Sequence, residues 1–112
     1  MSEFLNQDDA RRSRILEAAL AEFAEKGYKK ASTNTIVKEA GVSKGLLFHY
    51  FISKKDLYIY LYKFAIDTIT TELYEGVNFA DKDVINRVRQ STLVKIGSYI
   101  NHPLFMSLFE KF

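Results

Sequence analysis

Histidine is the side chain best suited to acid–base or metal chemistry near neutral pH, and this chain has two, His49 and His102. They are far apart in the sequence, and no carboxylate lies at metal-ligand spacing from either. The absence of cysteine excludes disulfides, thiolate chemistry and Cys-type zinc sites. The sequence also offers no glycine-rich phosphate loop, pair of catalytic carboxylates or Ser/His/Asp set. We therefore predict a protein that is not an enzyme and that has no metal ion or cofactor.

Binding is better supported than catalysis, and the residues that could bind lie in the stretch 33–50. Leu47 and Phe51 are four residues apart and should form the inward stripe of a short helix. Five side chains of this helix are then predicted to point mostly outward: Lys44, Leu46, Phe48, His49 and Tyr50. Apolar and aromatic groups would occupy more sides of the helix than a small core can cover. We expect a partner outside the domain to complete that surface.

The positive charge is concentrated around the same stretch. Residues 26–55 contain seven lysines and one acid, a net charge of +6, whereas residues 56–112 contain six basic residues and seven acids, a net charge of −1. A face that binds a polyanion needs such a concentration. A solvated lysine surface is the alternative interpretation of the charge alone.

Helical periodicity and capping residues predict the elements that would position these groups. A helix is expected over about 8–26, preceded by a mobile arm, with Gly27 as its left-handed end and Tyr28 packing back on Phe23. Ser32 or Thr33 should cap a second helix that stops at Gly41. Residue 43, a serine, should cap the third helix. A strand over 46–52 is the competing interpretation, but no partner strand pattern occurs elsewhere.

Three further helices are predicted after the capping pattern that begins at Ser53. They cover about 54–75, about 83–100, and a segment that has Pro103 at its first position. Gly97 is expected to mark a close contact or a bend in the fifth helix. The last helix carries an apolar stripe that no later segment covers: Leu104, Phe105, Leu108, Phe109 and Phe112. Such a stripe predicts an interface or a missing part of the fold.

At 112 residues the chain is about one domain long. Apolar runs long enough to span a membrane are absent, and the first ten residues do not resemble a signal peptide. An all-α, cytoplasmic protein that does not contact a membrane is therefore expected.

Residues 12–64 combine four ordered signals, and together they resemble the N-terminal DNA-binding domain of the TetR family of bacterial transcriptional regulators. These signals are the Gly-Tyr helix end, the Ile-x-x-x-Ala-Gly-Val-Ser turn, the His-Tyr-Phe helix end and the Ser-Lys-Lys-Asp-Leu start of the next helix. The resemblance covers about half of the chain. It implies a helix-turn-helix domain over 1–53, with the motif at about 32–51, inside a three-helix bundle. Residues 54–112 would begin a helical ligand-binding and dimerisation domain and leave it incomplete.

The resemblance also implies the residues that contact DNA. Thr33 and Tyr50 match phosphate-contacting positions, while Ser43 and Lys44 match positions that approach base edges or phosphate. His49 matches the position next to Tyr50, and Lys54 matches a lysine that commonly touches the DNA backbone. Two positions depart from the family pattern, because Leu46 stands where Thr, Ser or Ala is frequent and Phe48 replaces a frequent Tyr. Both can still contact a thymine methyl group.

The partners implied by the resemblance are a palindromic double-stranded operator, a second copy of the chain and a small hydrophobic inducer of the full-length protein. The chain would then be the N-terminal portion of a longer ligand-responsive repressor that acts as a homodimer. A different class of function stays open: a helical protein-interaction module that places its exposed aromatic helix in a partner groove. Salt dependence separates the two, because only phosphate neutralisation gives a steep slope.

Overall fold

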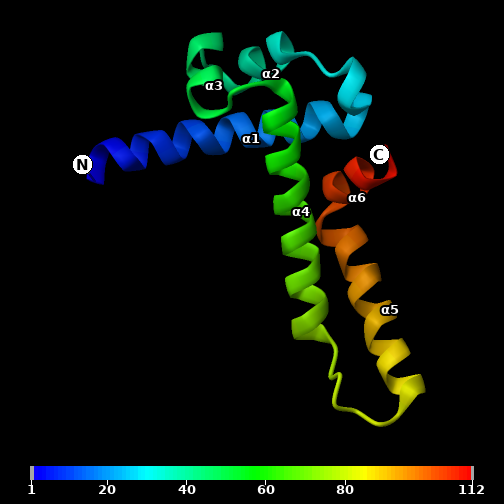
Figure 1. Cartoon of the computed structure of the whole chain (residues 1–112). Coiled ribbons are helices and arrows are strands. Elements are labelled where there is room, and N and C mark those ends of the chain that lie inside the picture. Colours follow the sequence, from blue (N-terminus) through cyan, green and yellow to red (C-terminus); the bar gives the residue numbers. More distant parts are fainter. Residues whose placement is uncertain (1, 112) are drawn as a thin grey trace.

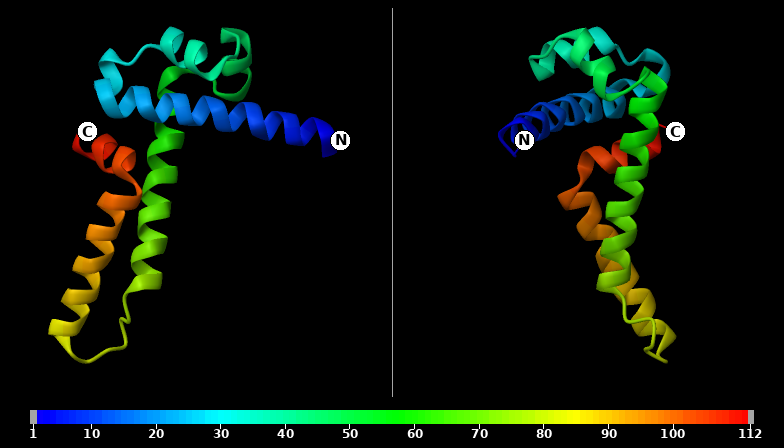
Figure 2. Two further views of the ribbon diagram at one scale, coloured as in Figure 1. Left: turned by 180° about the vertical axis from the view of Figure 1, so that it is seen from behind. Right: turned by 60° about the vertical axis from the view of Figure 1, so that its left-hand side comes forward.

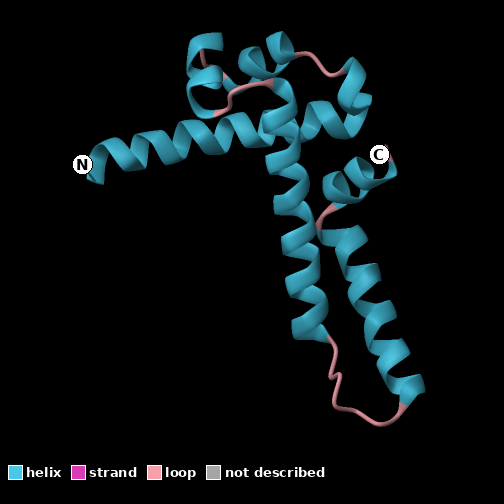
Figure 3. Ribbon diagram, in the orientation of Figure 1, coloured by secondary structure: helices cyan, strands magenta, loops and turns pink. Residues whose placement is uncertain are grey.

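The structure is a computed structural model, which describes residues 2–111 and the side chains of residues 9–111. The described chain consists of helices joined by short connections and contains no strand (Figure 3). The helices are α1 (Ser2–Lys30), α2 (Thr33–Ala40), α3 (Lys44–Tyr50), α4 (Lys54–Gly76), α5 (Val84–Asn101) and α6 (Pro103–Glu110). The predicted all-α fold is therefore confirmed. Helix α3 also removes the competing strand interpretation of 46–52.

Helix α1 is longer at both ends than predicted. It begins at Ser2, so the expected arm over residues 1–7 is wrong where the structure describes it, and Met1 lies outside the described residues. Gly27 does adopt a positive φ of 76°, but its ψ of 174° is not that of a left-handed helix cap. The chain kinks there and resumes helical geometry as far as Lys30. The predicted contact of Tyr28 with Phe23 is confirmed by ring centroids 6.4 Å apart.

Helices α2 and α3 are bounded by the residues that the sequence indicates. The Ser32 hydroxyl accepts from the backbone N–H of Thr35 at 3.3 Å, and the Ser43 hydroxyl accepts from that of Leu46 at 3.1 Å. Gly41 ends α2 with φ 69° and ψ 35°, a left-handed conformation that glycine adopts without strain. The two helices are thus joined by the tight turn of a helix-turn-helix.

Helix α4 starts with a variant of the predicted capping box. The Ser53 hydroxyl accepts from the Asp56 backbone N–H at 3.1 Å. The Asp56 carboxylate reaches back to the N–H of Ile52 at 3.0 Å, one residue before the cap. One backbone donor in the connection and one in the first turn of α4 are therefore satisfied. This fixes the direction in which the long helix leaves the helix-turn-helix.

Helices α4 and α5 form an antiparallel pair, and Gly76, at the end of α4, lies close to a side chain of α5. A Cβ atom placed on Gly76 would overlap the Val94 side chain of α5. At Gly97, by contrast, an added Cβ would meet nothing within 4 Å, so the predicted close contact there is wrong. Asp83 caps α5 through the backbone N–H groups of Ile85 and Asn86, and the prediction that Pro103 opens the last helix is confirmed.

The predicted uncovered stripe of α6 is wrong, because α6 turns back and packs against α1. Phe105 and Leu108 are 8% and 1% exposed. Phe109 is half-buried, with its ring centroid 5.3 Å from that of Tyr62. Leu104 is 43% exposed, and Phe112 lies outside the described residues. The amphipathic pattern indicated a buried face, but earlier helices cover it.

The core runs from the helix-turn-helix into the region where α1, α4 and α6 meet. Its largest fully buried side chains are Ile15, Phe23, Ile36, Leu47, Leu57 and Leu108. Figures 1 and 2 show α1 lying across the upper part of α4, α2 and α3 above it, and the α4–α5 pair extending away from them. The predicted boundary between residues 53 and 54 stays a prediction. None of the described helices is long and apolar enough to cross a membrane.

Candidate nucleic-acid interface

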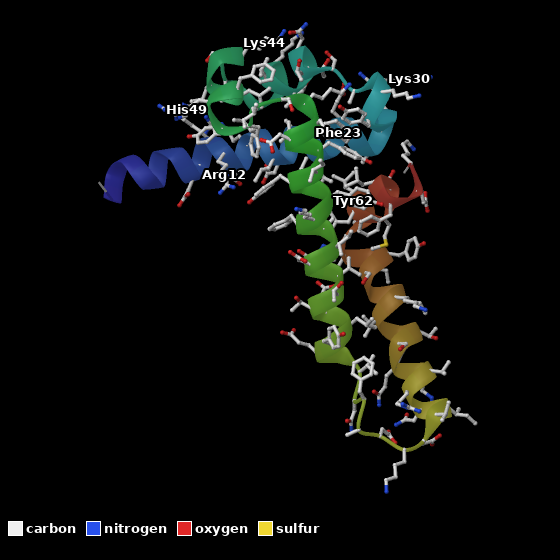
Figure 4. The ribbon with its side chains drawn as sticks, in the orientation of Figure 1. Arg12, Phe23, Lys30, Lys44, His49 and Tyr62 are labelled. Carbon is white, nitrogen blue, oxygen red and sulfur yellow. The ribbon has the colours of Figure 1, made fainter. Side chains whose placement is uncertain are left out.

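Helix α3 presents a mixed cationic and apolar surface to solvent. Leu47 is buried, and Phe51, just after the helix, is also buried, as predicted. Lys44 and His49 are exposed, and Phe48 keeps 41% of its surface in solvent. Figure 4 shows Lys44 and His49 on α3, at the end of the domain far from Lys30. The buried stripe therefore orients the opposite side of α3 outward.

The N-terminal end of α3 combines a capping serine with an unhindered glycine. Ser43 is exposed, and its oxygen already accepts from the Leu46 backbone N–H, which leaves its hydroxyl proton for an outside acceptor. A Cβ on Gly45 would meet only the Ser43 oxygen, at 3.9 Å. The folded chain does not itself need a glycine there. A close approach of a ligand to the helix backbone is thus open at this end.

The C-terminal end of α3 is aromatic. The rings of His49 and Tyr50 meet edge to face with centroids 5.5 Å apart, and Tyr50 in turn lies 6.5 Å from Phe51. Tyr50 is half-buried and packs against the core, so it is less outward than predicted. Leu46 is also half-buried. The outermost side chains of α3 are therefore Lys44, Phe48 and His49.

Thr33 and Lys54 lie outside α3, and the structure clarifies both. Because Ser32 caps α2, the hydroxyl of Thr33 is not needed for that purpose. Lys54 does not point free into solvent. Its ammonium donates to the Lys29 backbone carbonyl at 3.3 Å and lies 4.8 Å from the centre of the Tyr28 ring. Lys54 is thus held against the C-terminal end of α1.

Two long-range contacts that the sequence did not indicate fix the helix-turn-helix on α1. The buried Glu22 carboxylate accepts from the Ser32 backbone N–H at 2.8 Å and from Lys26 at 3.1 Å. The Arg14 guanidinium donates to the Ala40 carbonyl at 3.1 Å, a favourable place for a cation at the C-terminal end of α2. These partners are 10 and 26 residues apart. No local pattern could have paired them.

His102 also has a partner that sequence reasoning missed. Its Nε2 lies 2.6 Å from the Glu72 carboxylate of α4, and its ring stacks on Phe105 with centroids 5.1 Å apart. His102 therefore links the α5–α6 junction to α4. Within the described residues, no cluster of three or more His, Cys, Asp or Glu side chains could hold a metal ion.

The lysines of residues 26–55, which were assigned from the sequence to one polyanion-binding stretch, do not all lie on one face of the structure. Lys44 is the lysine within α3, whereas Lys26, Lys29, Lys30 and Lys55 line a groove formed by α1, α4 and α6. Lys38 lies on α2, and Lys54 is held against the end of α1, so the charge is spread over more than one surface. The α3 surface can donate hydrogen bonds and make apolar contacts. Both suit a groove wide enough to admit a helix, such as the DNA major groove.

Comparison with known proteins gives a consistent result. Residues 15–61 match the family model described as "Bacterial regulatory proteins, tetR family". The uncharacterized HTH-type transcriptional regulator YuxN of Bacillus subtilis (strain 168) is 32% identical over 96 residues, which cover 84% of this chain and 32% of YuxN. The HTH-type transcriptional regulator UidR of Escherichia coli (strain K12) is 48% identical over 46 residues, which cover 41% of this chain and 24% of UidR.

A solved structure extends the similarity beyond the helix-turn-helix. The crystal structure of a TetR family transcriptional regulator from Chloroflexus aurantiacus J-10-FL superposes with a TM-score of 0.80 at 30% sequence identity. The match covers 96% of this chain and 50% of that chain. The chain thus spans about a third of YuxN and half of the Chloroflexus protein.

Proposed function

This chain belongs to the TetR family of bacterial regulatory proteins, and from that premise we propose that it is a sequence-specific, DNA-binding transcriptional regulator. Double-stranded operator DNA is the proposed partner, and α3 is the proposed recognition helix in the major groove. The observation that carries the proposal is the outward surface of α3, where Lys44, Phe48 and His49 are exposed on a helix that Leu47 anchors to the core.

The proposed contacts fall into two groups. Thr33, Ser43, Tyr50 and Lys54 would bind phosphates and set the position of the domain on the duplex. Lys44, Leu46, Phe48 and His49 would discriminate bases, with lysine directed to guanine and the apolar groups to thymine methyls. Lys54 would have to leave Tyr28 and the Lys29 carbonyl to reach a phosphate. Reorientation of this one side chain is therefore part of the proposal.

We further propose that the full-length protein is a homodimer that binds a palindromic operator, acts as a repressor and is released by a small hydrophobic inducer. Two-fold symmetry would place two copies of α3 in successive major grooves. An inducer that favours another tilt of α4 would misplace them, because α4 leaves directly from the helix-turn-helix through the Ser53 cap. Residues 1–53 would form the reading domain and residues 54–112 the start of the regulatory domain.

Lys44 and the hydroxyl of Tyr50 are two of the proposed hydrogen-bond donors to DNA. Lys44→Ala and Tyr50→Phe are each expected to weaken binding to a duplex selected from random DNA by about tenfold, because each removes a donor to DNA while keeping the core intact. Gel-shift titrations at moderate salt measure the effect. Lys82→Ala, in the exposed connection between α4 and α5, is the matched control and should bind like the original chain.

The proposal fails if Lys44→Ala binds DNA with unchanged affinity. A salt series adds a second criterion, since phosphate neutralisation makes log K fall steeply with log salt. Lys54→Ala, which removes a proposed phosphate contact, should lower that slope by about one. Insensitivity to salt would instead favour the protein-interaction module, for which the 41% exposure of Phe48 is the supporting observation.

A further inference from the structure

A groove lies away from α3, between the C-terminal end of α1, the start of α4 and the end of α6. Its volume is about 740 Å³, within the range of small-molecule sites. We propose that it binds a small amphipathic anion, with an apolar body on the groove floor and an acidic head among the lysines. The lining residues are Lys26, Gly27, Tyr28, Lys29, Lys30, Lys55, Tyr58, Ile59 and Lys111.

The floor of the groove is aromatic and firmly held. The Tyr58 ring meets both Phe23 and Tyr28 edge to face, each at a centroid distance of 5.0 Å. Burial, together with the neighbouring Tyr62, raises the pKa of Tyr58, so its hydroxyl stays neutral and can donate a hydrogen bond to an anion. Ile59 adds an aliphatic surface that is 40% exposed. An apolar ligand body would cover this surface.

The rim of the groove carries uncompensated positive charge. Five of the lining residues are lysines and none is acidic. Lys26 is paired with Glu22 at 3.1 Å, but Lys29, Lys30, Lys55 and Lys111 form no ion pair within the described residues. Like charges around one concave surface repel each other and raise the local concentration of anions. A carboxylate, sulfonate or phosphate head group would offset that repulsion.

The groove is connected to the proposed DNA surface through Lys54. Its ammonium lies over Tyr28 and donates to the carbonyl of Lys29, and both of these residues line the groove. A ligand that holds Tyr28 in place also holds Lys54 away from DNA. The groove ligand should therefore weaken DNA binding. This regulatory consequence rests on the proposed function, whereas binding of the anion does not.

The test uses two fluorescent probes that share one aromatic ring system and differ in an anionic sulfonate group. 8-Anilinonaphthalene-1-sulfonate is an aromatic anion, and N-phenyl-1-naphthylamine is the same ring system without the sulfonate. Titrated into the 112-residue chain without DNA, the anion is expected to bind at one saturable site, at least about fivefold more tightly than the neutral probe. Lys30→Glu combined with Lys111→Glu should remove that preference, and Ile59→Ser should weaken both probes.

The matched control is Lys82→Glu, an exposed lysine that is not part of the groove, which should leave both affinities unchanged. Circular dichroism checks that each variant is folded, and Lys30→Gln with Lys111→Gln replaces the charge reversal if it is not. Equal affinity for the two probes would overturn the proposal, as would anion binding that the rim variants do not change. Rim variants that impair DNA binding but not anion binding would assign these lysines to nucleic acid and also overturn it. The Lys44→Ala variant tests the role of α3 in DNA binding separately, because Lys44 is not part of the groove.

Discussion

At the scale of single residues, buried polar groups hold helices together through contacts that could not be predicted from the sequence. Glu22 of α1 is only 5% exposed. Its carboxylate accepts a hydrogen bond from the backbone N–H of Ser32, in the short connection between α1 and α2. A glutamate within an amphipathic helix is usually solvated, so its burial could not be predicted from spacing. Arg12, also on α1, is half-buried, and its guanidinium lies 4.8 Å from the centre of the Tyr60 ring of α4.

Replacing Glu22 should therefore destabilise the domain. Glu22→Ala removes a charged acceptor from a buried backbone N–H and is expected to lower the free energy of unfolding by about 2 kcal/mol. Urea denaturation followed by circular dichroism measures it. Glu25→Ala, an exposed glutamate on the same helix, serves as the control and should change stability by less than about 0.5 kcal/mol. Equal effects of the two substitutions would contradict the role given to Glu22.

At the scale of elements, the helix boundaries that local chemistry sets were predictable. Ser32, Ser43 and Ser53 each accept a backbone hydrogen bond where the sequence places a cap. Gly27 was misjudged because a positive φ alone does not end a helix, and the ψ of this residue lets a further turn form. The eight proposed DNA contacts stay a prediction, since exposure shows which side chains are available but not what they bind.

The two glycines of the α4–α5 pair give opposite predictions. Gly76→Ala would force its Cβ into the Val94 side chain and should destabilise the protein by about 1–3 kcal/mol, because that side chain or α5 itself must move. Gly97→Ala meets nothing within 4 Å and should stabilise it by about 0.5–1 kcal/mol through helix propensity. Thermal unfolding of the two variants compares them directly. A lower melting temperature for Gly97→Ala would show that the close contact expected from sequence exists after all.

At the scale of the whole molecule, the chain is extended rather than spherical. Its radius of gyration is 17.0 Å, whereas a compact domain of this length has about 13 Å. The α4–α5 pair accounts for the extension, and α5 exposes many large apolar side chains: Val84, Ile85, Val88, Leu93, Ile96, Tyr99 and Ile100. From the sequence, the uncovered apolar surface was predicted on α6 and not on α5. An amphipathic pattern shows that one face of a helix is buried, but it does not show which segment covers that face.

The packing of α6 on α1 predicts that the far end of the chain stabilises the helix-turn-helix. Leu108→Ala creates a cavity at a side chain that is 1% exposed and should cost about 3 kcal/mol, whereas Leu104→Ala, at 43% exposure, should cost less than about 1 kcal/mol. Amide hydrogen exchange in α1 and α2 measures how far the loss spreads. Protection that falls only in α6 would contradict a shared core.

The bond from the Ser107 hydroxyl to the Ala24 carbonyl spans 83 positions of the sequence. During synthesis, the face of α1 that α6 covers is complete long before α6 has been translated. At about 5–20 residues per second, the ribosome adds residues 54–112 in about 3–12 seconds. For that interval the nascent helix-turn-helix lacks α4 and α6, which both pack against α1. The time at which the helix-turn-helix reaches its final packing therefore depends on translation speed as well as on its own sequence.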